Sequence, residues 1–292
     1  MRTETTTVVV TGAAVLLPGT DTVRALAEGP APGGAPVDPA AHVGRKGLRY
    51  KDRATQLGYA LTAAALRDAG LLGADEKEGI TVPATSVGVV ASSNFGNLDT
   101  VARALDTLRE ETVTATSPMD LPNASSNVIA SSAAIRYGLR GPNLMVCNGE
   151  TSGLDAVHWA ATLITAGRAE RVLVLGVEPD NEVVRRLLGG ERAVDGGAAL
   201  VVESRAAAAA RSATVRAVLG GYRRGAGEIA ARGRRWELPA HLGRASGTAG
   251  LLQVAAAVGF FDAGEPGPVQ AVTGSADGDA RADLLLLAPE AA

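Results

Sequence analysis

The chain has 292 residues, of which 46% are hydrophobic and only 3% aromatic, so it can bury a large core of Ala, Val and Leu. Its 28 Lys and Arg residues nearly balance 31 Asp and Glu residues, which argues against a nucleic-acid-binding protein. The single cysteine excludes a disulfide scaffold, and because the chain has only three scattered histidines besides it, we expect no metal site. No apolar run approaches the roughly 20 residues that cross a bilayer, and the N-terminus has no signal-peptide core. We therefore expect a cytoplasmic protein without membrane contact.

The N-terminal part of the chain begins with a strand and continues to a helix. The apolar run 6–11 predicts a buried strand closed by Gly12. The Pro- and Gly-rich stretch 29–40 predicts a surface loop. Apolar residues at helical spacing then predict a helix over 52–69, with Gly70 at its C-terminal cap.

Strand-like and helix-like stretches continue to alternate after residue 70. The further predicted strands are 86–91, 144–147, 171–177, 198–202, 215–219, 269–273 and 283–287. The further predicted helices are 98–109, 154–166 and 246–258, and a low-complexity Ala tract occupies 206–210. This alternation predicts an α/β protein with a largely parallel sheet covered by helices on both faces.

The first strand and turn suggest a nucleotide-binding fold, which the residues do not support. A turn that binds phosphate needs several glycines for a close backbone approach, whereas only Gly12 and Gly19 are available, with Pro18 before Gly19. None of the four tyrosines has a Lys four residues further on, as a short-chain dehydrogenase would require. We therefore reject a nucleotide site and expect no cofactor.

The stretch 141–167 is the most informative part of the sequence. It predicts a strand, an abrupt turn and a helix, an arrangement that holds the residue at the turn over the helix N-terminus. The dipole and free N–H groups there favour negative charge, and enzymes place a thiolate or a serine oxygen at this point. Here the residue is Glu150, followed by Thr151 and Ser152 as candidate helix caps.

Motifs on both sides of this turn resemble the β-ketoacyl synthase family, which has the thiolase fold. Gly141-Pro142-Asn143 resembles the family's approach to the active-site turn, and Thr151-Ser152-Gly153 resembles its exit. Four further stretches resemble the family, namely 8–12, 117–123, 134–142 and 166–177. The resemblance implies a thiolase-like layered α/β fold of two pseudo-repeated halves, with residues 1–205 forming the first half and 206–292 a shortened second half.

The departures from the family pattern concern its catalytic positions. Glu150 occupies the position of the family's nucleophilic cysteine, and a carboxylate cannot accept an acyl group by thioester exchange. The His-Gly-Thr motif is absent, and Gly243-Arg244 falls where the family has Gly-His. The stretch 273–279 replaces a loop that carries Phe-Gly-Gly. The sequence therefore predicts no catalytic residue for condensation.

A ketosynthase-like chain without these groups resembles the chain length factor of type II polyketide synthases, including the highly reducing branch. The resemblance implies a heterodimer with a catalytic ketosynthase, whose acyl tunnel this chain would shape, and an acyl carrier protein as a further partner. It implies binding residues at the dimer seam, namely Leu105, Leu108, Thr112, Val113, Thr116, Met119, Leu121, Asn123 and Asn143. Two alternatives remain open, a malonyl-thioester decarboxylase that uses Glu150 and a homodimeric degenerate ketosynthase that binds acyl groups.

Several residues allow more than one interpretation. Glu150 is either a solvated turn carboxylate or a group that stands in for an acyl carbonyl. Cys147 is expected on a buried strand, as a small hydrophobe rather than a displaced nucleophile, and His158 is expected as a packed core histidine. An arginine run predicts either a solvated linker or a landing surface for the acidic carrier protein, and it comprises Arg223, Arg224, Arg232, Arg234 and Arg235.

Overall fold

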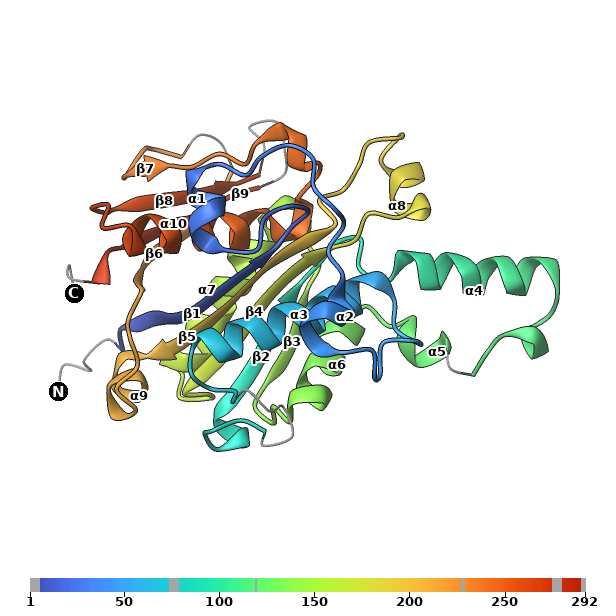
Figure 1. Ribbon diagram of the computed structural model, residues 1–292, viewed down its shortest axis with the longest axis horizontal. Helices are drawn as coiled ribbons and strands as arrows, with labels where there is room; N and C mark the ends of the chain where they lie inside the picture. Colours follow the sequence, from blue (N-terminus) through green and yellow to red (C-terminus); the bar gives the residue numbers. More distant parts are fainter. Residues whose placement is uncertain (1–5, 74–78, 119, 227–228, 275–279, 290–292) are drawn as a thin grey trace.

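A nine-stranded sheet forms the centre of the computed structural model, which describes residues 6–73, 79–118, 120–226, 229–274 and 280–289 (Figure 1). The strand order is β3-β2-β4-β5-β1-β6-β9-β8-β7. The strands are β1 (Val8–Leu16), β2 (Val87–Ser92), β3 (Asn143–Val146), β4 (Arg171–Glu178), β5 (Gly196–Ser204), β6 (Ala217–Gly225), β7 (Arg234–Arg235), β8 (Val269–Thr273) and β9 (Arg281–Leu287). All the predicted strands are therefore present, with ends that differ by a few residues.

The prediction of a largely parallel sheet is wrong. The pairs β2–β3, β2–β4 and β7–β8 are parallel, and the other five described pairs are antiparallel. The central strands β4 and β5 are buried along nearly their whole length. A strand buried on both faces is a continuous apolar run whichever direction its neighbour takes, so the sequence pattern does not reveal the direction.

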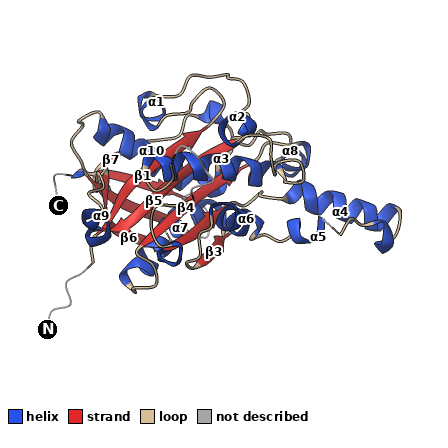
Figure 2. Ribbon diagram, turned by 60° about the horizontal axis from the view of Figure 1, so that its bottom comes forward, coloured by secondary structure: helices blue, strands red, loops and turns tan. Residues whose placement is uncertain are grey.

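Helices cover both faces of the central strands, as predicted (Figure 2). The α-helices are α1 (Val23–Glu28), α2 (Pro39–Val43), α3 (Arg53–Asp68), α4 (Leu98–Glu110), α5 (Asp120–Asn123), α6 (Val128–Tyr137), α7 (Ser152–Thr165), α8 (Glu182–Leu187), α9 (Arg205–Ala210) and α10 (Ala249–Asp262). Helices α3 and α6 pack together on one face, and α7 and α10 pack on the other. Helix α10 contacts β5 and β1 as well as β8 and β6, so the sheet curves around it.

The first strand continues through the glycine that was predicted to end it. Strand β1 runs on to Leu16, with a change of register against β5 between Val10 and Gly12. A Cβ atom on Gly12 would lie 2.7 Å from the carbonyl oxygen of Ala65 and 2.7 Å from the Cβ of Ala69. Gly12 therefore serves the close approach of α3 to the sheet rather than a turn. The predicted cap at the end of α3 is confirmed, because Gly70 has a φ of 70°.

The helices α7 and α10 begin in the same way and meet at their first turns. Each follows a 3₁₀ turn, η4 (Gly149–Thr151) before α7 and η6 (Ser246–Thr248) before α10. A Cβ atom on Gly153 would lie 2.8 Å from the carbonyl oxygen of Gly247, and one on Gly250 would lie 2.7 Å from Leu154. The sequences Thr-Ser-Gly-Leu and Thr-Ala-Gly-Leu at these starts form a short internal repeat. The predicted division of the chain at 205/206 falls just after the first residue of α9 and remains an expectation.

One segment stands away from the rest of the molecule. Helix α4, the 3₁₀ turn η3 (Val113–Ala115) and α5 form an arm that projects on the right of Figure 1. On α4 only Thr100 is buried, whereas Leu105 and Leu108 are exposed. The arm therefore adds surface and little core. Among the described residues, no helix has the length and apolar character needed to cross a membrane.

Candidate functional site

The predicted turn before α7 is present and holds Glu150 at its tip. Strand β3 ends at Val146, and the chain reverses through η4, where Gly149 has a φ of 86° that favours glycine. Glu150 is the central residue of η4, and its side chain is 48% exposed. A carboxylate therefore stands at the N-terminal end of α7, where the helix dipole stabilises negative charge.

The Glu150 carboxylate faces the guanidinium of Arg244, a residue far from it in the sequence. The Nη2 atom of Arg244 lies 3.8 Å from the Oε1 atom of Glu150, and both side chains are about half exposed. An ion pair of this length and exposure contributes well under 1 kcal/mol to stability. The positions that the resemblance assigns to a cysteine and a histidine are thus filled by a carboxylate and a guanidinium that face each other.

A pocket of about 400 Å³ opens beside this pair. Glu150, Glu237 and Arg244 line its charged part, and Gln253 and Thr273 are buried side chains of its wall. Neither a histidine nor a cysteine is among the described residues that line it. The described lining therefore supplies no group for thioester exchange and no imidazole to stabilise an oxyanion.

Asn94 joins the turn of Glu150 to the loop before α10. Its Nδ2 atom donates to the carbonyl oxygen of Gly149 at 2.8 Å and to Ser246 Oγ at 2.8 Å. Its Oδ1 atom accepts hydrogen bonds from Gly149 N and Ser152 Oγ, each at 3.2 Å. Ser246 has a φ of 37°, a conformation that is rare for a residue with a Cβ atom. Asn94 thus fixes both sides of the pocket, a role that sequence reasoning missed.

Glu178 holds the same loops through hydrogen bonds, and sequence reasoning did not identify it either. It is fully buried at the end of β4, and its carboxylate accepts hydrogen bonds from Ser93 Oγ at 2.9 Å, Asn94 N at 2.8 Å, Phe95 N at 2.9 Å and Gly247 N at 2.9 Å. Burial raises the pKa of Glu178 to about 7, although these hydrogen bonds act in the opposite direction. The only sequence signal is a glutamate at the end of an apolar strand.

Asp155, in the first turn of α7, connects this helix to Tyr222 on β6. Its carboxylate accepts hydrogen bonds from Asn148 Nδ2 at 2.6 Å, Thr151 Oγ1 at 2.8 Å and the Tyr222 hydroxyl. Burial and the Asp155 carboxylate raise the pKa of Tyr222, so the hydroxyl stays protonated and donates. The prediction of a core histidine at position 158 is wrong, because His158 is exposed and stacks on Tyr222 with ring centroids 4.2 Å apart.

Cys147 does not lie on a buried strand, which corrects the prediction. It follows the edge strand β3, and it is exposed. Partial burial of the sulfur and the nearby Glu178 carboxylate raise the pKa of the Cys147 thiol. The thiol therefore stays protonated near neutral pH, which does not favour a nucleophilic role.

Most of the predicted seam residues lie on the arm. Leu105 and Leu108 are exposed on α4, and Val113 is 73% exposed in η3. Thr112 is exposed at the start of η3, and Thr116 is half-buried at its end. These five residues therefore all lie on the arm.

Of the other four predicted seam residues, Leu121 and Asn123 also belong to the arm, through α5. Leu121 lies in α5, and Met119 lies outside the described residues. Asn123 is buried at the end of α5, where its Oδ1 atom accepts a hydrogen bond from Lys51 Nζ at 3.2 Å. Asn143 is the exposed first residue of β3 and donates to the carbonyl oxygen of Ala130 at 3.1 Å. Asn123 thus anchors the arm to the body.

The arginine run is held by partners within the chain. Arg223 and Arg232 bind the fully buried carboxylate of Asp283, on the face of β9 turned away from α10. The other partners are Asp155 for Arg224, Glu265 and the Phe260 ring for Arg234, and Gln270 for Arg235. These arginines therefore cover part of the sheet, which leaves less free positive charge for a carrier protein than the sequence suggested.

Comparison with known proteins identifies the family. The family described as "Beta-ketoacyl synthase, N-terminal domain" matches residues 37–187, just over half of the chain. The chain belongs to the β-ketoacyl synthase family. Among curated relatives, a 3-oxoacyl-[acyl-carrier-protein] synthase 2 of Vibrio harveyi is 33% identical over 137 residues, 47% of this chain and 32% of that protein. The granaticin polyketide putative beta-ketoacyl synthase 1 of Streptomyces violaceoruber is 32% identical over 203 residues, 60% of this chain and 48% of that protein.

The alignments with curated relatives thus cover about a third to a half of those ketosynthase chains. Solved structures match over nearly the whole chain. The ishigamide ketosynthase/chain length factor aligns with a TM-score of 0.76 and 20% identity, over 97% of this chain and 99% of that chain. The AntDE:AntF complex, a type II polyketide synthase carrier protein with its ketosynthase, aligns with a TM-score of 0.79 and 16% identity, over 98% and 100%. The predicted thiolase-like α/β fold is therefore confirmed.

Proposed function

We propose that this chain is the non-condensing chain length factor subunit of a type II polyketide synthase. It pairs with an active ketosynthase and shapes the tunnel that limits the length of the polyketide. The observation that carries the proposal is the Glu150–Arg244 pair, because the resemblance assigns these two positions to the nucleophile and a histidine of the family. A partner chain would then supply the cysteine and the two histidines that condensation requires.

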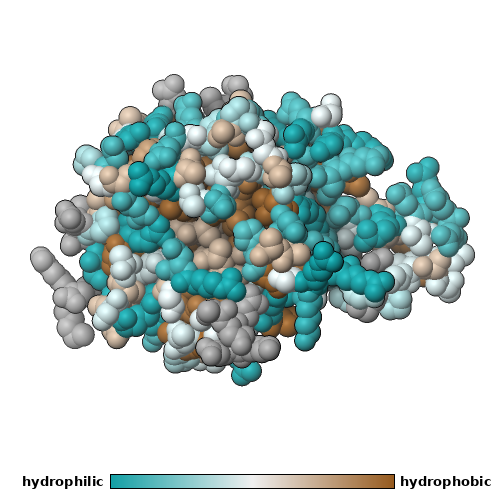
Figure 3. Space-filling model, in the orientation of Figure 1, coloured by the Kyte–Doolittle hydropathy of each residue, from teal (hydrophilic) through white to brown (hydrophobic). Residues whose placement is uncertain are grey.

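Two surfaces support a partner in the proposed heterodimer. Strand β3 is an edge of the sheet that the described strands form, and its outer side could pair with a strand from another chain. Ile135 on α6 is 82% exposed and Trp159 on α7 is 49% exposed, and both helices pack on β3 from opposite faces. The arm adds Leu105 and Val113, and it projects from the body in the space-filling view (Figure 3). Exposed apolar side chains beside an open edge strand are typical of a protein interface.

The charges of the pocket disfavour the decarboxylase alternative. Two carboxylates, Glu150 and Glu237, and one guanidinium, Arg244, line its charged part. A malonyl group carries its own carboxylate, which this excess of negative charge would repel. Carbanion formation after decarboxylation also needs donors to the enolate oxygen, and no histidine is among the described lining residues.

Reconstitution with a catalytic ketosynthase and its carrier protein tests the proposal. We expect the chain to be poorly soluble alone and to be rescued by co-expression with the ketosynthase. The reconstituted pair should make polyketide, and Glu150→Gln should leave the yield within about twofold because Glu150 does no chemistry. Turnover of malonyl thioester by the chain alone, lost in Glu150→Ala, would instead establish the decarboxylase. A stable homodimer that does not bind the ketosynthase would favour the homodimeric acyl-binding alternative.

The arm supplies a test of chain-length control. Replacing Thr112 or Thr116 by Trp adds a large side chain to the surface proposed to face the partner's tunnel, so the product should become shorter. Thr214→Trp is the control, because Thr214 is exposed on the connection between α9 and β6, at the opposite end of the molecule from the arm in Figure 1. The product mixture is read by mass spectrometry. An unchanged distribution of lengths in both arm variants would contradict the assignment of the arm.

A further inference from the structure

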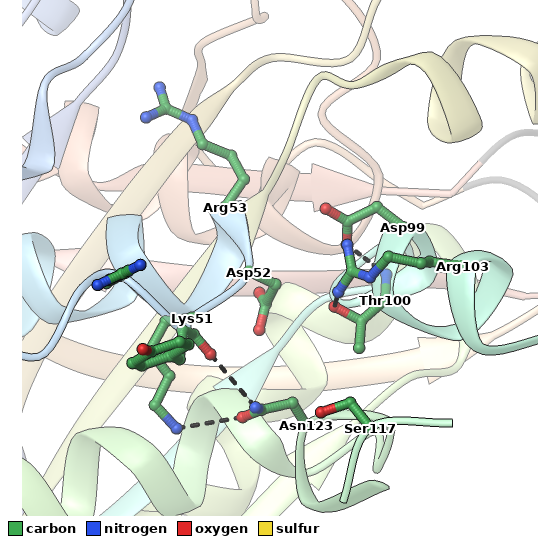
Figure 4. Close-up of a pocket in the computed structure, with 10 residues that line it drawn as sticks. Lys51, Asp52, Arg53, Asp99, Thr100, Arg103, Ser117 and Asn123 are labelled. Carbon is green, nitrogen blue, oxygen red and sulfur yellow. Dashed lines mark hydrogen bonds between the residues drawn. The ribbon is translucent and has the colours of Figure 1, made fainter. Parts of the chain in front are cut away.

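A polar cavity of about 370 Å³ lies where the arm meets the body (Figure 4). It is lined by the loop before α3, the first turns of α4 and the segment that ends with α5. Leu98 at the start of α4 packs against the buried side chains of Phe95 and Val184, and beyond it only Thr100 of α4 is buried. Because the base of the arm has little apolar packing, individual hydrogen bonds gain weight in setting its direction.

Asn97, the residue at the N-terminal cap position of α4, binds the far end of the arm instead of capping its own helix. Its side chain makes no capping hydrogen bond to the first turn of α4, although an asparagine at this position usually stabilises its helix in that way. Its Nδ2 atom donates to the carbonyl oxygens of Asn123 at 2.6 Å and of Ser125 at 3.1 Å, and the residue is buried. Asn97 therefore joins the start of the arm to its end, 26 residues further along the chain.

Lys51 joins this end of the arm to the body. Its Nζ atom donates to Asn123 Oδ1 at 3.2 Å and to Ser132 Oγ, on α6, at 3.3 Å. Asn123 Nδ2 in turn donates to the carbonyl oxygen of Tyr50 at 3.3 Å, and in Figure 4 the side chains of Lys51 and Asn123 point toward each other. Hydrogen bonds from a charged donor are stronger than those between neutral groups, so we expect the Lys51 contacts to matter most among these.

We propose that Asn97, Asn123 and Lys51 form a latch that fixes the direction of the arm and, through the arm, the length of the product. The inference about length rests on the proposed function, in which the arm faces the partner's tunnel. The arm carries the exposed side chains of Leu105 and Val113, and a closed latch presents them to the partner from one direction. The latch lies at the base of the arm, so its members are positioning residues rather than lining of the tunnel.

Hydrogen–deuterium exchange of α4, in the chain alone or co-purified with its ketosynthase, measures whether the latch holds the arm. An isolated helix of 13 residues is barely stable in water, so the protection of α4 depends on how its ends are fixed. Lys51→Met removes the donors and keeps the length of the side chain, and Asn97→Ala removes the link to Asn123 and Ser125. Each should make the α4 amides exchange ~10-fold faster, the change expected from the loss of one hydrogen bond, while the amides of α10 keep their rates.

Two further variants separate the latch from a general loss of stability. Lys46→Met is the matched control, because Lys46 is exposed, its ammonium group has no partner among the described residues, and it lines no part of the cavity. It should leave the α4 amides unchanged. Lys51→Arg keeps the charge and the donors, so its α4 amides should exchange more slowly than those of Lys51→Met. The latch is overturned if Lys51→Met and Asn97→Ala exchange like Lys46→Met, or if α10 accelerates as much as α4.

Product lengths in the reconstituted synthase test the second part of the proposal. An open latch lets the arm take several directions, so Lys51→Met and Asn97→Ala should shift the product from one main length to several, whereas the Trp variants of Thr112 and Thr116 shorten it. Shorter products from the Trp variants together with an unchanged distribution from both latch variants would overturn the role of the latch in chain length. If no variant alters the product, or no polyketide forms, the proposed function and the inference about length fail together, and the exchange rates still decide whether the latch fixes the arm.

Discussion

Replacing Glu178 by Gln should change how the stability of the protein depends on pH. The fully buried carboxyl has a pKa of about 7, against an ordinary value of 4.5. Between these values the folded chain holds a proton that the unfolded chain releases, so the free energy of unfolding falls as pH rises from about 4.5 to about 7. A shift of about 2.5 units at about 1.4 kcal/mol per unit makes this loss about 3 kcal/mol.

The Gln variant keeps the shape of the side chain and removes the titration. Its amide NH₂ group must replace one oxygen that accepts hydrogen bonds, either from Asn94 N and Gly247 N or from Ser93 Oγ and Phe95 N. This mismatch lowers stability by about 1–3 kcal/mol at every pH. The informative quantity is therefore the change of stability with pH rather than its level.

Urea unfolding followed by circular dichroism at pH 5 to 8 measures this quantity. The original chain should lose about 2–3 kcal/mol more than the Gln variant across the range. Glu182→Gln is the control, because its side chain is 87% exposed and should leave the pH profile unchanged. Other titrating groups are common to all three proteins and cancel in the comparison. Parallel pH profiles for the original chain and Glu178→Gln would refute the reasoning.

Two further predictions concern packing and a partly buried ion pair. Gly153→Ala should lower the free energy of unfolding by about 1–3 kcal/mol, because its Cβ would lie 2.8 Å from the carbonyl oxygen of Gly247. Gly58→Ala is the control and should lower it less, because its Cβ contacts would be 3.3 Å or longer. Thermal unfolding of the two variants measures the difference. Asp195→Ala should cost about 2–4 kcal/mol, because it leaves Arg53 unpaired and places Ala at a φ of 49°. A loss below 0.5 kcal/mol in urea unfolding would contradict the assignment of this pair.

The sequence by itself determined the elements and the position of the turn. Helical spacing and capping residues are local properties, so α3 begins after Asp52 and ends before Gly70 as predicted. The strand–turn–helix around Glu150 was likewise readable, because its residues are adjacent in the chain. The resemblance to the family then led to the prediction that Glu150 replaces a nucleophile there.

Tertiary structure alone decided the partners of these elements. Strand directions, the pairing of Glu150 with Arg244 and the exposure of His158 depend on segments far apart in sequence. Asn94 and Glu178 carry no local pattern that marks them, yet they join three loops around the pocket. A buried polar side chain must find hydrogen-bonding partners wherever the fold supplies them, and a linear sequence does not specify which distant groups those are.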